Sequence, residues 1–412
     1  MIILGIEIPL YIQLGIKPNK MSYKEKNLIV CDTETIRGKP LTLQLYNGEG
    51  EPKLYFKNEK SITPQFCSYL DQFTMSRWGK RQNVLYFHNL VFDMVEVLYS
   101  QHRLFKDNEF TVECYGWKFQ VFHGKSAFVK ASKGNTSILM VDSWSFLKSS
   151  LMKIADQFGF TYKKLDKPKK LGYYKYTKKN KHFCEYAKQD VLIQYELAET
   201  IDEMHREFDI KQTISIADMA STIFRKKFLK HSIPFPPSLC TRFSLLSYHG
   251  GKNAFYVKSG KYKDVKIIDI NSAYPYAMTF LPSFYNGKYV FTKGNKKKKF
   301  EKVGIYKVWC LVKESKYGLV YNEKFKRESG KVIWYCTGWE LMEAIENDLV
   351  TVIQFEGYTW KGDTKKPNPF KDFVKFFYER KSTCTDTQRM FYKTIMNSLY
   401  GKFIQRSKDV VY

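Results

Sequence analysis

Metal-binding cysteine pairs and membrane segments are both missing from the sequence. Its eight cysteines are scattered, with no Cys-x-x-Cys pair and no Cys/His cluster, which argues against a structural zinc site and for a reducing compartment. No apolar run is long enough to cross a bilayer. The stretch from Met1 to Ile16 is fairly apolar, but it contains Glu7 and has neither a basic front nor a small-residue cleavage site. We therefore expect a soluble, intracellular protein without a signal or anchor, in which Met21 is an alternative start.

Acidic residues are few compared with basic ones. The 412 residues include 68 Lys plus Arg against 41 Asp plus Glu, a formal net charge of +27, together with 30 Tyr and 32 Phe. Such a basic balance suits a polyanion, because phosphates attract Lys and Arg, and aromatic rings suit unpaired bases. Compositional drift in an A·T-rich genome would enrich Lys, Phe and Tyr without any such function. Composition therefore favours nucleic-acid binding without establishing it.

Linkers rich in Gly and Ser and internal repeats are also absent, so domain boundaries rest on other signals. Strands mixed with helices up to about residue 205 predict one α/β domain over 21–205. A proline-rich break at Ile233–Pro237 separates this domain from the C-terminal half of the chain. We place a connecting region at 206–260, a second domain at 261–412 and an extension of doubtful status at 1–20.

Apolar periodicity locates the main elements of the first domain. Short apolar runs predict strands at 28–31, 41–46, 84–87 and 136–141. Helices are predicted from near Asp93, at 151–158 and at 183–204. Two Lys-rich runs, at 161–182 and 296–299, are interpreted as a surface loop and a hairpin tip.

Carboxylates recur at three places along the predicted first domain. Asp32 and Glu34 come directly after the strand 28–31 and are two residues apart, so they point to one face. Asp93 ends the run 86–93, and Tyr186 and Asp190 share one face of a predicted helix. Singly, these features are explained by a solvated turn, a helix cap and a surface tyrosine. As a set, the four carboxylates can hold two divalent metals, Mg²⁺ or Mn²⁺, which stabilise the attacking and leaving oxygens at phosphorus.

In this order, Asp32-x-Glu34, Asn89-x-x-Phe92-Asp93 and Tyr186-x-x-x-Asp190 resemble the three motifs of the DnaQ-like 3′–5′ exonuclease domain of family B DNA polymerases. The run 86–93 looks especially like the protein-primed bacteriophage enzymes. The resemblance implies an RNase H-like α/β fold, with the four carboxylates as metal ligands and Tyr186 as the residue that orients a water. It implies that the 3′ end of DNA is held by His88, Asn89 and Phe92.

Two weaker features complete the predicted exonuclease. The family has a Ser/Thr-Leu-x-x-hydrophobic motif that binds single-stranded DNA, which Ser150-Leu151-Met152-Lys153-Ile154 fits. The alternative, Ser143-Trp144-Ser145-Phe146-Leu147, lies closer to a strand end but has Trp in place of Leu. Protein-primed members also use a lysine before the third motif to steady the scissile phosphate. Lys163, Lys164 and Lys167 are the candidates, with Lys164 preferred for its distance from Asp190, and an ordinary surface lysine is the alternative for each.

The second half of the chain resembles a family B polymerase palm and fingers of α+β type. Tyr248-His249-Gly250-Gly251 is similar to a Tyr-x-Gly-Gly motif that contacts the template strand. A strand is predicted at 266–270, and 269–275 resembles motif A, with Ala273 replacing Leu. The resemblance makes Asp269 a metal ligand and catalytic residue, places the backbone of Ile270 at the triphosphate, and places Tyr274 beneath the incoming sugar.

The run from Lys393 to Gly401 resembles motif B without departure, on a helix predicted over 376–396. On this helix the four motif residues Lys393, Asn397, Tyr400 and Gly401 share a face. A lysine at this place can neutralise triphosphate oxygens as the leaving group departs, and the resemblance implies that Asn397 and Tyr400 contact the nucleotide, with DNA passing Gly401. Lys381 is a second candidate contact for the triphosphate, in competition with Arg380 and Arg389.

Motif C, Tyr-x-Asp-Thr-Asp, does not occur in the 412 residues. With one palm carboxylate a two-metal polymerase site is incomplete, so we expect that this chain alone does not extend primers. A surplus near 284–370 looks like the insertion by which the protein-primed subgroup contacts its priming protein and duplex. The expected partners are DNA, dNTPs, a terminal priming protein and a separate C-terminal polymerase fragment. A phage or plasmid origin would place the protein in a host cytoplasm or an organelle.

Two other functions remain open on this sequence. One is a stand-alone 3′–5′ exonuclease whose palm segment is vestigial, and the other is a non-catalytic DNA-binding remnant. The complete set of four acidic exonuclease residues argues against the remnant. The unbroken motif B argues against a vestigial polymerase half.

Overall fold

The computed structural model describes residues 2–3, 6–7, 16–36, 39–57, 62–74, 81–98, 109–124, 126–166, 180–251, 257–285, 287–295, 299–313, 330–362, 367–384 and 386–403. The chain divides into two compact units. The larger unit comprises Asn19–Lys227 and Phe377–Leu399. The smaller unit comprises Met1–Pro18, Phe228–Phe376 and Tyr400–Tyr412.

An eight-stranded sheet organises the larger unit, in the order β5-β4-β3-β6-β10-β9-β8-β7. The neighbours β3, β6 and β10 pair in parallel, and the other pairs are antiparallel. The strands are β3 (Lys26–Ile36), β4 (Lys39–Tyr46), β5 (Lys53–Phe56), β6 (Gln82–Phe87), β7 (Glu109–Cys114), β8 (Trp117–Phe122), β9 (Phe128–Lys133) and β10 (Thr136–Asp142). The parallel strands end at one edge of the sheet, where polar side chains from distant parts of the chain can meet.

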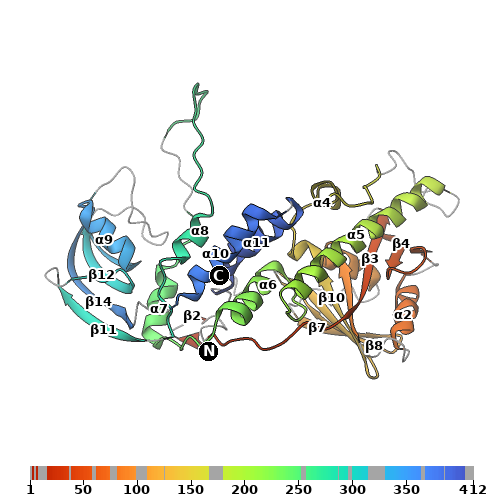
Figure 1. Cartoon of the computed structure of the whole chain (residues 1–412), viewed down its shortest axis with the longest axis horizontal. Coiled ribbons are helices and arrows are strands. Elements are labelled where there is room, and N and C mark those ends of the chain that lie inside the picture. The colour runs from red at the N-terminus through yellow and green to blue at the C-terminus, as the bar shows by residue number, and fades with distance from the viewer. Residues whose placement is uncertain are drawn as a thin grey trace. The chain divides into compact units, whose positions relative to one another are not determined.

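Helices cover both faces of this sheet. The covering helices are α2 (Thr63–Asp71), α3 (Leu90–Val97) and α5 (Lys181–Glu207), while α4 (Leu151–Phe158) packs on α5 and α6 (Ile216–Ile223) follows α5 in the chain. The long helix α5 packs on β3 and β4, as Figure 1 shows. Apolar side chains of α2 and α3 join a core cluster with the other face of the sheet.

Side-chain alternation along β3 decides which residue meets which helix. Cys31 belongs to the core cluster that also contains Met94 of α3. Because successive strand residues point to opposite faces, Thr33 shares the α3 side with Cys31. Asp32 and Glu34 then face the side on which α5 packs.

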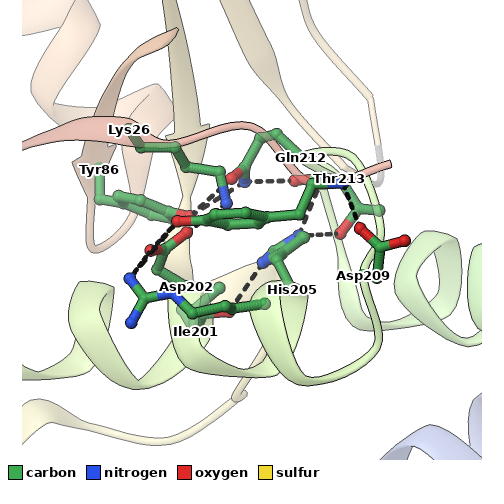
Figure 2. Close-up of polar contacts among 10 residues, drawn as sticks. Lys26, Tyr86, Ile201, Asp202, His205, Asp209, Gln212 and Thr213 are labelled. Atoms are coloured by element: carbon green, nitrogen blue, oxygen red, sulfur yellow. Dashed lines mark hydrogen bonds and ion pairs between the residues drawn. The ribbon is translucent and has the colours of Figure 1, made fainter. Parts of the chain in front are cut away.

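Buried polar side chains tie the C-terminal end of α5 to the sheet (Figure 2). Lys26 of β3 forms an ion pair with Asp202 of α5, and both side chains are almost fully buried. His205, which is fully buried, lies with Nδ1 2.7 Å from the carbonyl oxygen of Ile201, and its Nε2 accepts a hydrogen bond from the Thr213 N–H at 3.0 Å. These contacts fix the start of the central strand and the turn after α5.

Most elements predicted for the first domain are confirmed, with two corrections. The strands at 28–31, 41–46, 84–87 and 136–141 lie within β3, β4, β6 and β10, and the two later helices match α4 and α5. Asp32 and Glu34 lie inside β3 rather than after it, because pairing with β4 extends this strand to Ile36. The helix expected near Asp93 begins at Leu90, directly after Asn89 adopts a left-handed backbone with φ 90°.

A four-stranded antiparallel sheet forms the main core of the smaller unit, in the order β11-β14-β12-β13. Its strands are β11 (Gly287–Asn295), β12 (Gly304–Val312), β13 (Gly330–Thr337) and β14 (Val350–Gly362). One face packs on α9 (Gly338–Glu346), through a cluster that includes Tyr306, Trp334 and Leu341. Helix α7 (Ser238–Ser247) also packs on this sheet, where Phe243 contacts Tyr335 edge-on. The short strands β1 (Ile2–Ile3) and β2 (Ile6–Glu7) pair separately.

Two predictions for the second half are wrong. Residues 266–270 form no strand, and Ile267 and Ile268 are 94% and 88% exposed; an apolar run becomes a strand only when a neighbour accepts its backbone hydrogen bonds. The helix predicted over 376–396 is two helices, α10 (Pro369–Thr383) and α11 (Asp386–Phe403). The Ser-Thr-Cys-Thr sequence at the break has low helix propensity. Of the Lys run 296–299, residues 296–298 lie outside the described residues.

The remaining short helix, α8 (Ala273–Met278), begins within the predicted motif A. Among the described residues, no helix combines the length and the apolar content needed to span a bilayer.

Candidate active site

Three of the predicted carboxylates meet at the edge of the larger unit's sheet. Asp32, Glu34 and Asp190 each offer an oxygen, and these oxygens all lie within 4.8 Å of one another. The first two come from β3 and the third from α5, which packs on that face of the strand. Glu34 and Asp190 are 7% and 2% exposed, so the cluster, here called the acidic triad, is largely shielded from water.

Mutual repulsion makes the acidic triad a fit site for cations. Burial, followed by the charges of Asp190 and Glu34, raises the pKa of Asp32 to about 8, and Lys164 opposes this shift. Carboxylates forced together in this way are stabilised by a proton or by a cation. Hard oxygen ligands at such spacing suit Mg²⁺ or Mn²⁺.

Lys164 is the lysine that reaches the acidic triad. Its Nζ lies 2.7 Å from Asp190 Oδ2 and 5.4 Å from the ring centre of Tyr186. The neighbouring Lys163 points elsewhere and donates to the Ala155 carbonyl at 2.9 Å. Lys167, the third candidate, lies outside the described residues. Of the two adjacent lysines, Lys164, which the sequence preferred, is the one whose side chain contacts Asp190.

Tyr186 lies beside the same cluster, one helical turn before Asp190. The side chain is 4% exposed. Its pKa is raised by burial and then by the charges of Asp190, Glu34 and Asp32. The phenol is therefore neutral at ordinary pH and can donate or accept a hydrogen bond at the acidic triad.

Asp93, the fourth predicted carboxylate, lies outside the group whose oxygens are all within 4.8 Å of one another. Thr33 Oγ1 donates to Asp93 Oδ1 at 2.7 Å, and Asp93 is 2% exposed. Alternation along β3 places Thr33 on the α3 side of the strand, which is why Asp93 of α3 meets it. The carboxylate is still close enough to be affected by Asp32, because burial and then the charge of Asp32 raise the pKa of Asp93 well above its usual range.

The end of β6 is held by a residue that the sequence did not indicate. Asp142, at the end of β10, accepts hydrogen bonds from the backbone N–H groups of Asn89 and Trp144, both at 3.0 Å. β10 pairs in parallel with β6, with Asp142 opposite Phe87. Only this register shows that Asp142 supports the left-handed turn at Asn89.

His88 is a neutral, partly buried side chain at the same edge. Its Nδ1 lies 2.9 Å from Ser143 Oγ, and its Nε2 lies 3.0 Å from the Ser149 carbonyl oxygen. Burial, reinforced by the charge of Lys164, lowers the pKa of His88 to about 4. The imidazole fixes the segment after β10 against the turn that carries Asn89.

Two exposed rings border this edge. Phe92 is 46% exposed and Trp144 is 40% exposed, and the Trp144 ring lies 5.4 Å from that of His88. The predicted DNA contacts Ser150 and Leu151 are placed differently. The Ser150 hydroxyl accepts from the Lys153 N–H as the N-cap of α4, and Leu151 is 7% exposed.

In the smaller unit, tyrosines from motifs A and B are stacked. The rings of Tyr274 and Tyr400 lie 4.6 Å apart at an interplanar angle of 11°. Gly251 approaches the Tyr274 hydroxyl so closely that an added Cβ would lie 3.2 Å from it. Tyr248 is 49% exposed, and Gly250 is also exposed. Asp269 and Ile270 lie exposed in the irregular segment before α8.

The remaining motif B residues line α11. Lys393, Tyr400 and Gly401 are exposed and Asn397 is half-buried, as expected for one helix face. Arg380 is engaged by Glu207, whose carboxylate also accepts from the Tyr392 hydroxyl at 3.0 Å. Arg389 donates to the Lys381 carbonyl at 3.2 Å. Arg380 is thus committed to a contact within the larger unit.

Residues 167–411 match the sequence model of the family "DNA polymerase type B, organellar and viral". The chain belongs to this family. The match covers more than half of the polypeptide, including Asp190 and both polymerase motifs. It supports the first prediction, a family B polymerase of the viral and organellar kind.

Named relatives are fungal. A probable DNA polymerase of Podospora anserina is 23% identical over 315 residues, which cover 67% of this chain and 26% of that protein. A probable DNA polymerase of Agaricus bitorquis is 28% identical over 279 residues, covering 64% of this chain and 34% of that protein. The chain thus spans between a quarter and about a third of the length of these relatives.

The fold is that of phi29 DNA polymerase. The structure of that enzyme with primer-template DNA and incoming nucleotides has a TM-score of 0.63 at 18% identity, covering 91% of this chain and 68% of that one. The complex with single-stranded DNA gives 0.61 at 19% identity, covering 92% and 67%. The predicted fold class, an RNase H-like exonuclease domain followed by a partial palm and fingers, is confirmed.

Proposed function

We propose that the larger unit of this chain is a metal-dependent 3′–5′ exonuclease that removes nucleotides from single-stranded DNA ends, within a family B DNA polymerase. The observation that carries this proposal is the convergence of Asp32, Glu34 and Asp190 within 4.8 Å. Lys164 and Tyr186 border that cluster. Membership of the polymerase family supports DNA as the substrate.

Each residue of the site has a role that follows from its chemistry. Asp32, Glu34 and Asp190 would hold two divalent cations, which when bound polarise the phosphodiester and activate water. Tyr186 orients the attacking water through its neutral hydroxyl. Lys164 places positive charge where the phosphate gains negative charge. Asp93, which accepts a hydrogen bond from the Thr33 hydroxyl, would supply a fourth carboxylate next to Asp32.

The 3′ end of DNA needs a surface for unpaired bases beside this cluster. Phe92 and Trp144 are exposed there, and base stacking on such rings is tolerant of sequence. Asn89 is presented by its left-handed turn, where the amide can reach a sugar or base edge. We propose Trp144, rather than Leu151 and Ser150, as the single-strand contact.

The polymerase half of the proposal rests on motifs A and B. Asp269 would hold metal, Ile270, Tyr274, Lys381, Lys393, Asn397 and Tyr400 would contact nucleotide, and Tyr248, Gly250, Gly251 and Gly401 would contact DNA. The 412 residues supply no Tyr-x-Asp-Thr-Asp motif. We propose that DNA-templated polymerisation needs a second palm carboxylate in addition to these residues.

Protein priming is the finer part of this proposal. The fold likeness to phi29 DNA polymerase and the sheet at 287–362 within the second half support an inserted subdomain. A terminal priming protein is the partner that such a subdomain would contact. Replication of viral or plasmid DNA is the corresponding process.

Degradation of 3′-labelled single-stranded DNA tests the exonuclease. Purified chain with Mg²⁺ or Mn²⁺ should release mononucleotides, and Asp32→Ala combined with Glu34→Ala should abolish release. Loss of the acidic side chains removes the cations, so residual activity should be at least about 10³-fold lower. If the double variant degrades DNA as fast as the parent chain, the site assignment is wrong. Binding without cleavage by the parent chain would favour the non-catalytic remnant.

A further inference from the structure

Gln194 occupies an unusual position one helical turn beyond Asp190 on α5. The side chain is 1% exposed. In one amide orientation Nε2 donates to the Tyr86 carbonyl at 3.4 Å. In the swapped orientation, which satisfies both polar atoms, nitrogen donates to the Cys31 carbonyl at 3.2 Å and oxygen accepts from the His88 N–H at 2.6 Å. One side chain therefore contacts the backbones of β3 and of the residue after β6.

These two backbone groups lie where the central strands separate. The parallel pairing of β3 with β6 runs from Lys26 opposite Gln82 to Val30 opposite Tyr86 and then ends. The next carbonyl on β3 and the next free N–H beyond β6 need other partners. A primary amide has the same donor and acceptor as a peptide unit. The side chain of Gln194 can therefore bridge the two strands by hydrogen bonds just beyond the point where their backbone pairing ends.

The residues of the proposed site begin where the pairing of β3 with β6 ends. Cys31 directly precedes Asp32, and His88 directly precedes Asn89. Gln194 lies on α5, the helix that also carries Tyr186 and Asp190. One amide thus links the three elements that bear the three exonuclease motifs, at the residues adjoining those motifs.

We infer that Gln194 is a positioning residue of the exonuclease site, which sets the separation of β3 and β6 and fixes α5 against both. The inference rests on the proposed exonuclease function. Without the amide, Asp190 and Asp32 lose their common anchor, and the carboxylates no longer hold the spacing that two cations need. A displacement of about 1 Å at a reacting centre costs on the order of 100-fold in rate.

Gln194→Met tests this role, with Gln212→Met as the matched control. Methionine keeps the length and removes both hydrogen bonds. Gln212 is also a buried glutamine of the larger unit, and its Nε2 donates to the Tyr86 hydroxyl at 2.9 Å (Figure 2). We expect Gln194→Met to lower kcat on single-stranded DNA by about 10- to 100-fold with KM within about twofold, while Gln212→Met changes neither. Equal kcat in the Gln194→Met variant and the parent chain overturns the inference.

Gln194→Glu supplies a conservative rescue. The ionised carboxylate accepts from the His88 N–H but cannot donate to the Cys31 carbonyl, whereas a protonated carboxyl does both. The rate of this variant relative to the parent chain should therefore rise as the pH falls from about 8 to about 6. A ratio that does not change with pH contradicts a role that depends on both hydrogen bonds.

Mn²⁺ binding by calorimetry separates failure of this inference from failure of the proposed function. Gln194→Met should weaken Mn²⁺ binding at least about fivefold relative to Gln212→Met, whether or not the chain cleaves DNA. A parent chain that binds Mn²⁺ but cleaves no DNA sinks the exonuclease proposal and leaves the positioning role standing. Unchanged Mn²⁺ affinity in an active enzyme sinks the positioning role alone.

Discussion

At the scale of single residues, the proposed site combines three carboxylates that repel one another with one positively charged side chain, that of Lys164. Asp32, Glu34 and Asp190 are forced together by the strand and helix that carry them. Lys164 is the described lysine within ion-pair distance of Asp190. A side chain 28% exposed can leave the carboxylate when a phosphate arrives. This exposure fits the proposed role of Lys164 as a contact for the phosphate of the substrate.

Lys164→Ala should therefore slow DNA cleavage without unfolding the protein. We expect kcat on single-stranded DNA to fall about 10- to 100-fold, because one positive charge near the phosphate is lost. Lys163→Ala is the matched control, since that lysine donates to the Ala155 carbonyl instead. Steady-state cleavage of 3′-labelled DNA measures both. Equal losses in the two variants would mean that general positive charge, not Lys164, is what matters.

At the scale of elements, the segment between β10 and α4 contains both candidates for the single-strand DNA contact that the sequence left undecided, and the structure places them differently. Ser150 caps α4, and Leu151 packs in the interior. Trp144 lies two residues after the end of β10 and contacts His88 edge-on. Ser150 therefore stabilises α4, whereas the exposed ring of Trp144 is the proposed contact with DNA.

Ser150→Ala and Trp144→Ala should separate these roles. Loss of the cap should lower the free energy of unfolding by about 1 kcal/mol and leave DNA affinity unchanged. Loss of the ring should weaken binding of single-stranded DNA by about 1–3 kcal/mol with little effect on stability. Thermal unfolding and fluorescence anisotropy of labelled DNA measure the two effects. The reverse pattern would restore Ser150-Leu151 as the DNA contact.

The polar network at the end of α5 makes the larger unit sensitive to acid (Figure 2). Burial, and then the charge of Lys26, lowers the pKa of His205 well below the ordinary value of 6.5. The unfolded chain binds a proton below that value while the folded chain does not, so stability is lost as the pH falls below about 6.5. The neutral imidazole accepts from the Thr213 N–H, which an imidazolium cannot do.

His205→Gln should flatten this dependence. In the parent chain, the midpoint temperature of unfolding should decrease as the pH is lowered from 7 to 5. The variant should have a lower midpoint temperature at pH 7 and a smaller decrease over the same range. His249→Gln, a change at an exposed histidine, should keep the parent slope. An identical slope in the His205→Gln variant would show that other groups govern the acid sensitivity.

At the scale of the whole molecule, the two halves differ in how complete their proposed sites are. The larger unit presents its acidic triad, lysine and tyrosine together. The polymerase motifs include one palm carboxylate, Asp269, in an exposed irregular segment. The chain also spans only 68% of the phi29 enzyme whose fold it shares.

Primer extension should therefore be absent when the purified 412-residue chain is supplied with primer-template DNA, dNTPs and Mg²⁺. The two-metal mechanism needs a second palm carboxylate. Adding a polypeptide that carries a Tyr-x-Asp-Thr-Asp motif from a family member should restore incorporation, and its Asp-to-Ala version should not. Incorporation by the chain alone would contradict the prediction.

The sequence by itself determined which side chains lie together when the relevant geometry lies within one element. Two-residue spacing in a strand places Asp32 and Glu34 on one face, and four-residue spacing in a helix places Tyr186 and Asp190 together. Periodicity of this kind is local and needs no knowledge of the fold. Motif order along the chain then indicated the family, which the comparisons confirmed.

Only the tertiary structure decided how separate elements meet. Asp93 pairs with Thr33 instead of joining the acidic triad, because α3 covers the opposite face of β3. The roles of Asp142 and Gln194 have no local signal, since Asn89 lies more than 50 residues from Asp142 and Gln194 reaches both β3 and the residue after β6. The run at 266–270 is apolar like a strand, yet a strand also needs a paired neighbour. Such contacts depend on strand register and helix packing, which are set by the whole chain and not by any short stretch of it.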